Sequence, residues 1–363
     1  IKINPLQRFY PTFCRLSRNM RKYYLMIMIS LVLQACGTRD ENILIVKDIR
    51  PAESVKTEII DVPGLFHPTR LYRFGDKLLM KDDMSKECQM YIYDLRSGEL
   101  TRALRKGRGP GESIGAFYFA MTLPDSVVVV NDITLVNMLE MPLDSLDKDW
   151  YISTRKTTGM VDGINSGAIC GYEENNLLVM ASYEDARFVV YDLKDTSVVR
   201  KIVYSPDTVH GKCDRLVMTS YVGVIKYSPV QKKSVIACRF ADQLEIYDFA
   251  KDTVMFIKGP ALFEPGGKPF ITKYGLAGYS QTDDTIKGYV DVCCDDHYIY
   301  TIYSGRLCSE DNASYGREIR IFDWKGRLKK VLQTDVDVIA LDVDGNGDMY
   351  CLTLDDNLVR IVE

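Results

Sequence analysis

The sequence predicts an all-β fold, and within that class a six-bladed β-propeller with four-stranded antiparallel blades. Three observations support this. A strand motif, Ile92-Tyr93-Asp94-Leu95, recurs along the chain; its copies are spaced roughly as blades are; and no apolar stretch longer than two turns follows helical periodicity. The copies begin at residues 92, 138, 190, 246, 321 and 358. Most intervals are close to the ~40–50 residues of one blade.

Each copy of the motif has the neighbouring strands that a blade requires. An apolar run precedes every copy, and an alternating strand follows four of them. Asp, Asn, Gly and Ser occupy the turns, as tight hairpins require. The preceding runs span residues 78–80, 126–130, 177–180, 234–237, 298–302 and 349–352, and the following strands span 100–104, 198–203, 254–257 and 328–332. The longest interval contains an insertion at residues 263–284.

The two ends of the repeat array complement each other. The last motif copy has no strand after it, whereas residues 57–62 form an extra strand before the first unit. Pairing this N-terminal strand with the last blade would close the ring and protect both sheet edges. We therefore expect the N-terminal strand to close the last blade.

The N-terminal region has the pattern of an export signal. Arg21-Lys22 precede an apolar run at residues 23–33, which is too short to span a membrane and ends in Ala35-Cys36. We expect residues 1–19 to be a mis-assigned upstream extension, 20–35 a lipoprotein signal peptide, 36–42 a tether and 43–363 a single propeller domain. The alternative is an ordinary core segment with an isolated cysteine.

Composition excludes some partners. The chain has 363 residues, of which 46% are hydrophobic and 26% charged, which is typical of a globular protein. From Cys36 onward it carries 40 basic and 50 acidic residues, a net charge of −10. An acidic surface repels phosphate backbones, so we expect no nucleic-acid partner. We expect a monomer whose membrane contact is its lipid anchor alone.

The cysteines follow no disulfide or zinc pattern. The eight after Cys36 include no Cys-x-x-Cys pair, and most lie inside apolar runs, where cysteine acts as a small apolar residue. The sequence leaves their redox state open.

The chain resembles the TolB-like six-bladed propeller lipoproteins of the Bacteroidetes. The resemblance rests on the lipobox-like end at Cys36, the repeated Ile-Tyr-Asp-Leu strand and the run Gly107-Arg108-Gly109-Pro110-Gly111-Glu112. It implies a six-bladed propeller and lipidation of Cys36, which would make an outer-membrane lipoprotein of the cell envelope, facing the periplasm or the surface. It implies no established activity.

The glycine run is the first candidate ligand site. Gly107, Gly109 and Gly111 allow unusual backbone angles and Pro110 stiffens the segment. The cations beside the exposed amides would form an anion-binding nest; they are Arg105, Lys106 and Arg108. The alternative is a tight crossing between blades in which Glu112 binds backbone amides or an arginine.

Enzymatic sites are weakly indicated. Lactonase-like propellers hold a metal in the channel, and the candidates here are Asp83, Glu112, Asn131 and Asp132. Residues 111–115 match Gly-x-Ser-x-Gly, but no α/β pattern surrounds them. Residues 342–348 resemble a calcium loop but lack its last ligand, so a hairpin turn is the better interpretation.

We therefore expect a non-catalytic binding or scaffold module for a peptide, glycan or protein partner. The alternative is a metal-dependent channel enzyme of lactonase-like type. We expect no cofactor, and calcium is the remaining candidate. No catalytic residue or metal ligand is assigned.

Overall fold

The computed structural model describes residues 42–362 except 48, 50, 123–126, 136, 143–167, 182 and 274–276. The predicted signal peptide and Cys36 lie outside the described residues. Leu44–Glu363 form one compact unit. In the part of the chain that the structure describes, no helix is long and apolar enough to cross a membrane.

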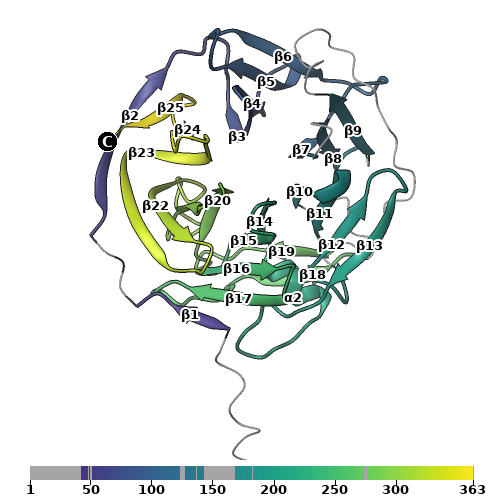
Figure 1. Cartoon of the computed structure of the whole chain (residues 1–363), viewed down its shortest axis with the longest axis vertical. Helices are drawn as coiled ribbons and strands as arrows, with labels where there is room; N and C mark the ends of the chain where they lie inside the picture. Colours follow the sequence, from purple (N-terminus) through teal and green to yellow (C-terminus); the bar gives the residue numbers. More distant parts are fainter. Residues whose placement is uncertain are drawn as a thin grey trace, which may run out of the picture. The chain divides into compact units, whose positions relative to one another are not determined.

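The compact unit consists of small antiparallel sheets arranged around an axis (Figure 1). The first blade contains β3 (Pro68–Phe74), β4 (Lys77–Asp82), β5 (Cys88–Asp94) and β6 (Leu100–Arg105). The second contains β7 (Ala116–Met121), β8 (Val127–Asp132) and β9 (Asn137–Pro142). The third contains β10 (Ala168–Tyr172), β11 (Asn176–Met180), β12 (Phe188–Asp192) and β13 (Ser197–Ile202), with a 3-10 turn, η3 (Glu173–Asn175), between β10 and β11. These three sheets are the first three blades of the predicted six-bladed propeller.

The remaining three blades complete the ring. The fourth contains β14 (Gly223–Ser228), β15 (Lys233–Cys238), β16 (Gln243–Asp248) and β17 (Thr253–Lys258). The fifth contains β20 (Tyr289–Cys294), β21 (Tyr298–Tyr303), β22 (Gly316–Asp323) and the first part of β23 (Leu328–Val343). The sixth contains the second part of β23, then β24 (Met349–Thr353), β25 (Leu358–Val362) and β2 (Glu53–Ile60). The first strand of each blade lies nearest the axis (Figure 1).

The repeated motif marks one position in every blade. All six copies lie in third strands, namely β5, β9, β12, β16, β22 and β25. Most residues of these strands are buried, because successive side chains point to opposite faces and each face packs against a neighbouring blade. In four copies the third residue is an aspartate, a residue that favours turns. In the first blade, for example, Asp94 Oδ1 accepts the N–H groups of Arg96 and Ser97 at 2.9 Å.

The N-terminal strand closes the last blade, as the sequence predicted. β2 pairs antiparallel with β25, from Lys56 opposite Val362 to Ile60 opposite Leu358. Two features were not predicted. β1 (Ile43–Ile45) joins the fourth blade beside β17, and β23 is long enough to serve two successive blades.

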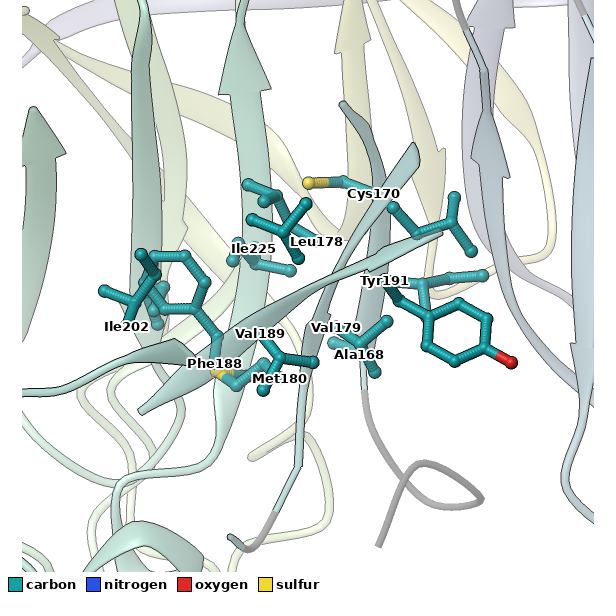
Figure 2. Packing of buried hydrophobic residues seen from close by; sticks show 14 of the residues in the cluster. Ala168, Cys170, Leu178, Val179, Met180, Phe188, Val189, Tyr191, Ile202 and Ile225 are labelled. Atoms are coloured by element: carbon teal, nitrogen blue, oxygen red, sulfur yellow. The ribbon is translucent and has the colours of Figure 1, made fainter. Parts of the chain in front are cut away.

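Apolar side chains fill the spaces between blades. One buried cluster joins the second, third and fourth blades, and Figure 2 shows Ile225 of β14 among side chains of the third. Other clusters join the first and second, the fourth and fifth, and the fifth, sixth and first blades. Since burying one large apolar side chain contributes about 1.5–3 kcal/mol, these contacts hold the inner strands in register around the axis.

The predicted insertion lies between the fourth and fifth blades. It contains the hairpin β18 (Lys268–Ile271) and β19 (Ala277–Ser280). A short helix, α2 (Arg215–Ser220), packs against this hairpin. Asp214 begins the helix by accepting the N–H of Val217 at 3.0 Å.

Candidate functional site: two cavities at the propeller axis

Four inner strands carry a β-bulge, which lies close to the start of β3, β7 and β20 and at the beginning of the second part of β23. Thr69 of β3, Phe117 of β7, Val290 of β20 and Ile339 of β23 are extra residues, each without an opposite partner in the next strand. A bulge bends a strand and redirects the side chains beside it, and bulges are frequent next to binding sites. Three of these four residues line the same cavity.

This cavity, which we call the basic cavity, has a volume of about 210 Å³. Four of its side chains are basic, and they come from the first, fourth and fifth blades. A fifth charged side chain, that of Asp83, is a carboxylate. The lining residues are Thr69, Arg70, Lys81, Asp83, Arg239, Lys287, Val290, Ser314 and Ile339.

Two of the cations face each other across a strand pair. Arg70 of β3 and Lys81 of β4 are directly opposite, and Lys81 is 6% exposed. Like charges in this relation destabilise a sheet. Asp83 offsets part of the cost, because it contacts the Lys81 ammonium and accepts the Thr69 hydroxyl at 2.8 Å. Burial, with Arg70 and Lys106 nearby, still lowers the pKa of Lys81 to about 8.

The other two cations are held together by the backbone. The N–H of Gly288 donates to the carbonyl of Arg239 at 2.8 Å, and this places Lys287 beside Arg239. A Cβ on Gly288 would lie 2.4 Å from the carbonyl oxygen of Ala241, so only glycine allows the approach.

Lys287 is a buried cation in a cationic environment. It is 9% exposed, and its ammonium lies 5.2 Å from the ring centroid of Phe240. Burial is the main cause that lowers the pKa of Lys287, and the positive charges of Arg239 and Arg70 contribute, to a value of about 7. No described carboxylate forms an ion pair with Lys287 or Arg239 within 4.0 Å. Arg239 instead hydrogen-bonds the side chain of Tyr118.

A second cavity, which we call the thiol cavity, lies further along the same inner strands. Its volume is about 250 Å³. It is lined by Tyr72, Arg73, Phe74, Phe119, Ala120, Met121, Cys170, Gly171, Lys226, Tyr227, Pro229, Cys293, Cys294 and Asp342.

The lysine of the thiol cavity has compensating neighbours. Burial alone would lower the pKa of Lys226, but Asp342, Tyr72 and Asp291 raise it. The Lys226 ammonium lies 4.7 Å from the ring centroid of Tyr72. The eight cysteines of the described residues are free thiols.

The glycine run forms the crossing from the first to the second blade. Glu112 Oε2 accepts the N–H of Gly109 at 2.8 Å, and a Cβ on Gly107 would lie 1.9 Å from the same oxygen. The carboxylate of Glu112 therefore occupies the space beside these glycines. Gly111 has a φ of 77°, which favours glycine. Pro110 is exposed beside it.

The cations of the run have different surroundings. Arg105 Nε lies 4.0 Å from Glu112 Oε1 with a largely exposed side chain, and Arg108 is exposed. Lys106 donates to the backbone carbonyls of Ser85 and Asp83. The crossing thus fastens the loop that carries Asp83, one residue of the basic cavity.

Asp132 stabilises this same crossing from β8. It accepts the Ser113 hydroxyl at 2.6 Å and four backbone amides, those of Ile114, Gly115, Thr134 and Leu135. Burial alone would raise the pKa of Asp132, but these hydrogen bonds lower it. Asn131 is completely buried beside it.

Metal ligands do not gather at any described position. The described residues contain no group of three or more His, Cys, Asp or Glu side chains placed to hold a metal ion. In the calcium-like loop, Asp344 Oδ1 accepts the amides of Asn346 and Asp348 at 2.8 Å, in the turn between β23 and β24.

Sequence reasoning missed the four cations of the basic cavity. A signal existed, because Lys81 and Arg239 each follow directly on the apolar run in the second strand of their blade. Aligning the repeats would have placed both at the same end of the ring. The sequence does not reveal that Lys287 joins them, because this depends on the contact between Gly288 and Arg239.

Comparisons with known proteins agree with the architecture. Two solved structures share the fold. A Bacteroides fragilis protein provisionally assigned as exported is 13% identical, with a TM-score of 0.54 over 88% of this chain and 98% of that one. A member of the DUF4221 family from Bacteroides vulgatus is 10% identical, with a TM-score of 0.52 over 85% and 96%. No curated protein matches the chain in sequence.

The family model "TolB-like 6-blade propeller-like" matches residues 52–346, which is most of the chain. The match confirms the predicted family and agrees with the six blades described above. The chain belongs to the TolB-like six-blade propeller-like family.

Proposed function

We propose that the protein is a non-catalytic binding module of the cell envelope, and that its ligand enters the basic cavity. The observation that carries this proposal is the convergence of side chains from four blades on one cavity at the axis. Ligand sites are typically concave and combine apolar walls with a few precisely placed polar groups. Here Val290 and Ile339 supply apolar wall, and the basic side chains supply the polar groups.

The chemistry of the lining favours binding over catalysis. The nine described lining residues include neither histidine nor cysteine. Their carboxylate, Asp83, is engaged by Lys81 and Thr69. Hydroxyl and thiol nucleophiles are usually activated by an adjacent base such as histidine, and these nine residues contain no Ser–His or Cys–His pair. A peptide, glycan or protein could present the group that is bound.

The proposed location rests on the N-terminal sequence. The pattern at residues 20–36 favours export and lipidation of Cys36. The Bacteroides fragilis protein of the same fold is itself provisionally assigned as exported. Metabolic labelling with a fatty-acid analogue tests the anchor: label is expected on the full chain and should be lost in Cys36→Ser. Equal labelling of both would contradict it.

The binding function is tested by thermal-shift screening of the purified full chain. The screen would contain envelope peptides, glycans and small anions. Ligands that raise Tm should lose their effect in Arg239→Met and retain it in Lys201→Met, an exposed and distant control. The proposal would be contradicted if the ligands raise the Tm of Arg239→Met as much as that of the wild type, or if a ligand is converted into product. A metal-specific rise in Tm that is lost in Asp83→Asn would also contradict it.

A further inference from the structure

We infer that the basic cavity binds the dianionic phosphate group of its ligand, an inference that rests on the binding function proposed above. Four cationic side chains meet in a cavity of about 210 Å³, which is several times the ~30 Å³ that one water molecule occupies in the liquid. A phosphate group therefore fits with space for the rest of a small molecule or for ordered water.

The charge balance of the cavity favours a negative ligand. Buried charges are normally paired, because removing an ion from water costs several kcal/mol. Asp83 compensates Lys81, but Arg239 and Lys287 have no described carboxylate within ion-pair distance. Asp291, buried on β20, also acts on Arg70 and Arg239, and it is shared with Lys226. The cavity therefore keeps an excess of positive charge that a dianion would neutralise.

The donors suit a phosphate better than a single carboxylate. Phosphate carries −1.5 to −2 charges at pH 7 and three strong acceptor oxygens, whereas a carboxylate has one charge and two oxygens. Two guanidinium and two ammonium groups approach the cavity from three different blades. Such a spread of directions suits a tetrahedral anion, since planar carboxylates are best bound by one guanidinium in a bidentate manner.

The cavity is prepared for this role by the backbone. The bulge at Thr69 lies immediately before Arg70, whose guanidinium Nη1 donates to the Thr69 carbonyl at 3.1 Å. Gly288 brings Lys287 against Arg239. In contrast, the glycine run uses its amides within the chain, since Gly109 donates to the Glu112 carboxylate and Gly107 to the Ser113 carbonyl, so the run is not the place where we expect the phosphate.

Isothermal titration calorimetry with the full chain tests the inference. The probes are inorganic phosphate, glycerol 3-phosphate and succinate, and the variants are Arg239→Met and Lys287→Met. The controls are Lys201→Met and Arg108→Ala, two exposed cations outside both cavities. Because a charged hydrogen bond contributes about 1.5–3 kcal/mol, each cavity variant should weaken phosphate binding roughly 10- to 100-fold.

The result expected is phosphate binding that both cavity variants weaken and the controls leave unchanged, with succinate weaker than phosphate. If glycerol 3-phosphate binds more tightly than inorganic phosphate, the phosphate group belongs to a larger ligand. If inorganic phosphate binds and glycerol 3-phosphate does not, the ligand is free phosphate. Equal binding by all variants, or succinate binding as well as phosphate, would overturn the inference. If neutral ligands bind the basic cavity and phosphate does not compete, the phosphate assignment fails while the binding function stands.

Discussion

The two cavities at the axis share the inner strands β3, β20 and β23, but their buried lysines have opposite electrostatic surroundings. In the thiol cavity, Lys226 lies beside Tyr72 and near Asp342 and Asp291, and its pKa is raised despite burial. In the basic cavity, Lys287 lies near Arg239 and Arg70, and its pKa is lowered to about 7. On β20, Val290 lines the basic cavity and Cys293 the thiol cavity, so the two cavities lie close together along the strand. The surroundings of a buried lysine nevertheless change from compensating to repulsive between them.

A third cation shows what structural pairing looks like in this protein. Arg187 is completely buried, and its Nε and Nη2 lie 2.8 and 2.9 Å from the two oxygens of Glu245. The chain can thus supply a bidentate partner to a buried cation when stability alone is concerned. Leaving Lys287 without one costs stability, and the binding of an anion would explain why the cost is tolerated.

Matched glycine substitutions should have the largest effects and separate the two cavities. A Cβ on Gly288 would lie 2.4 Å from the Ala241 carbonyl oxygen, and one on Gly171 would lie 1.7 Å from that of Met121. Gly288→Ala and Gly171→Ala should each lower the free energy of unfolding by about 3 kcal/mol, measured by urea denaturation. Only Gly288→Ala should also abolish phosphate binding. Loss of binding in Gly171→Ala alone would reverse the assignment of the cavities.

Removing the two lysines should change stability with opposite signs. Lys226→Met removes the positive charge that acts most strongly on Asp342 and Asp291, and it should lower the free energy of unfolding by about 2 kcal/mol at pH 6. Lys287→Met removes an uncompensated charge and should raise it by about 1–2 kcal/mol. Denaturant unfolding of both variants beside the wild type gives the comparison. Destabilisation by Lys287→Met at pH 6 would show that this cation is paired after all.

The same difference predicts a pH dependence. The pKa of Lys287 is about 7 in the folded chain and near 10.5 when exposed, so between these values the unfolded chain binds the extra proton. Stability should therefore rise with pH in this window, by at most ~1.4 kcal/mol per unit for one proton. Below pH 7 the penalty is fully present. The stabilisation by Lys287→Met should accordingly shrink between pH 6 and 9, and a constant difference across that range would exclude the shift.

The smallest effect should come from the glycine run. Arg108 is exposed, so Arg108→Ala should change the free energy of unfolding by less than about 0.5 kcal/mol and leave phosphate binding unchanged. The measurement is the same titration as for the cavity variants. Tenfold weaker binding would restore the glycine run as the anion site.

The architecture could be predicted from the sequence because its signals are local. The Ile92-Tyr93-Asp94-Leu95 motif reports a strand and its turn within a few residues, and closure by β2 follows from counting strands. The joining of β1 to the fourth blade left no such signal, since an edge strand of three residues has little periodicity.

The basic cavity could not be predicted in the same way. Arg70 and Lys81 are opposite only because of a bulge at Thr69, and Lys287 reaches Arg239 across two blades. These relations depend on the register of strands far apart in sequence. The glycine run was a candidate because its composition is unusual, but its Gly109 amide binds the neighbouring Glu112.

The most direct test is a crystal structure of the protein grown with arsenate, an anomalously scattering analogue of phosphate. The account predicts an anomalous peak in the basic cavity, within hydrogen-bond distance of the Arg239 guanidinium and the Lys287 ammonium. A peak in the thiol cavity or at the glycine run, with the basic cavity holding only water, would contradict it.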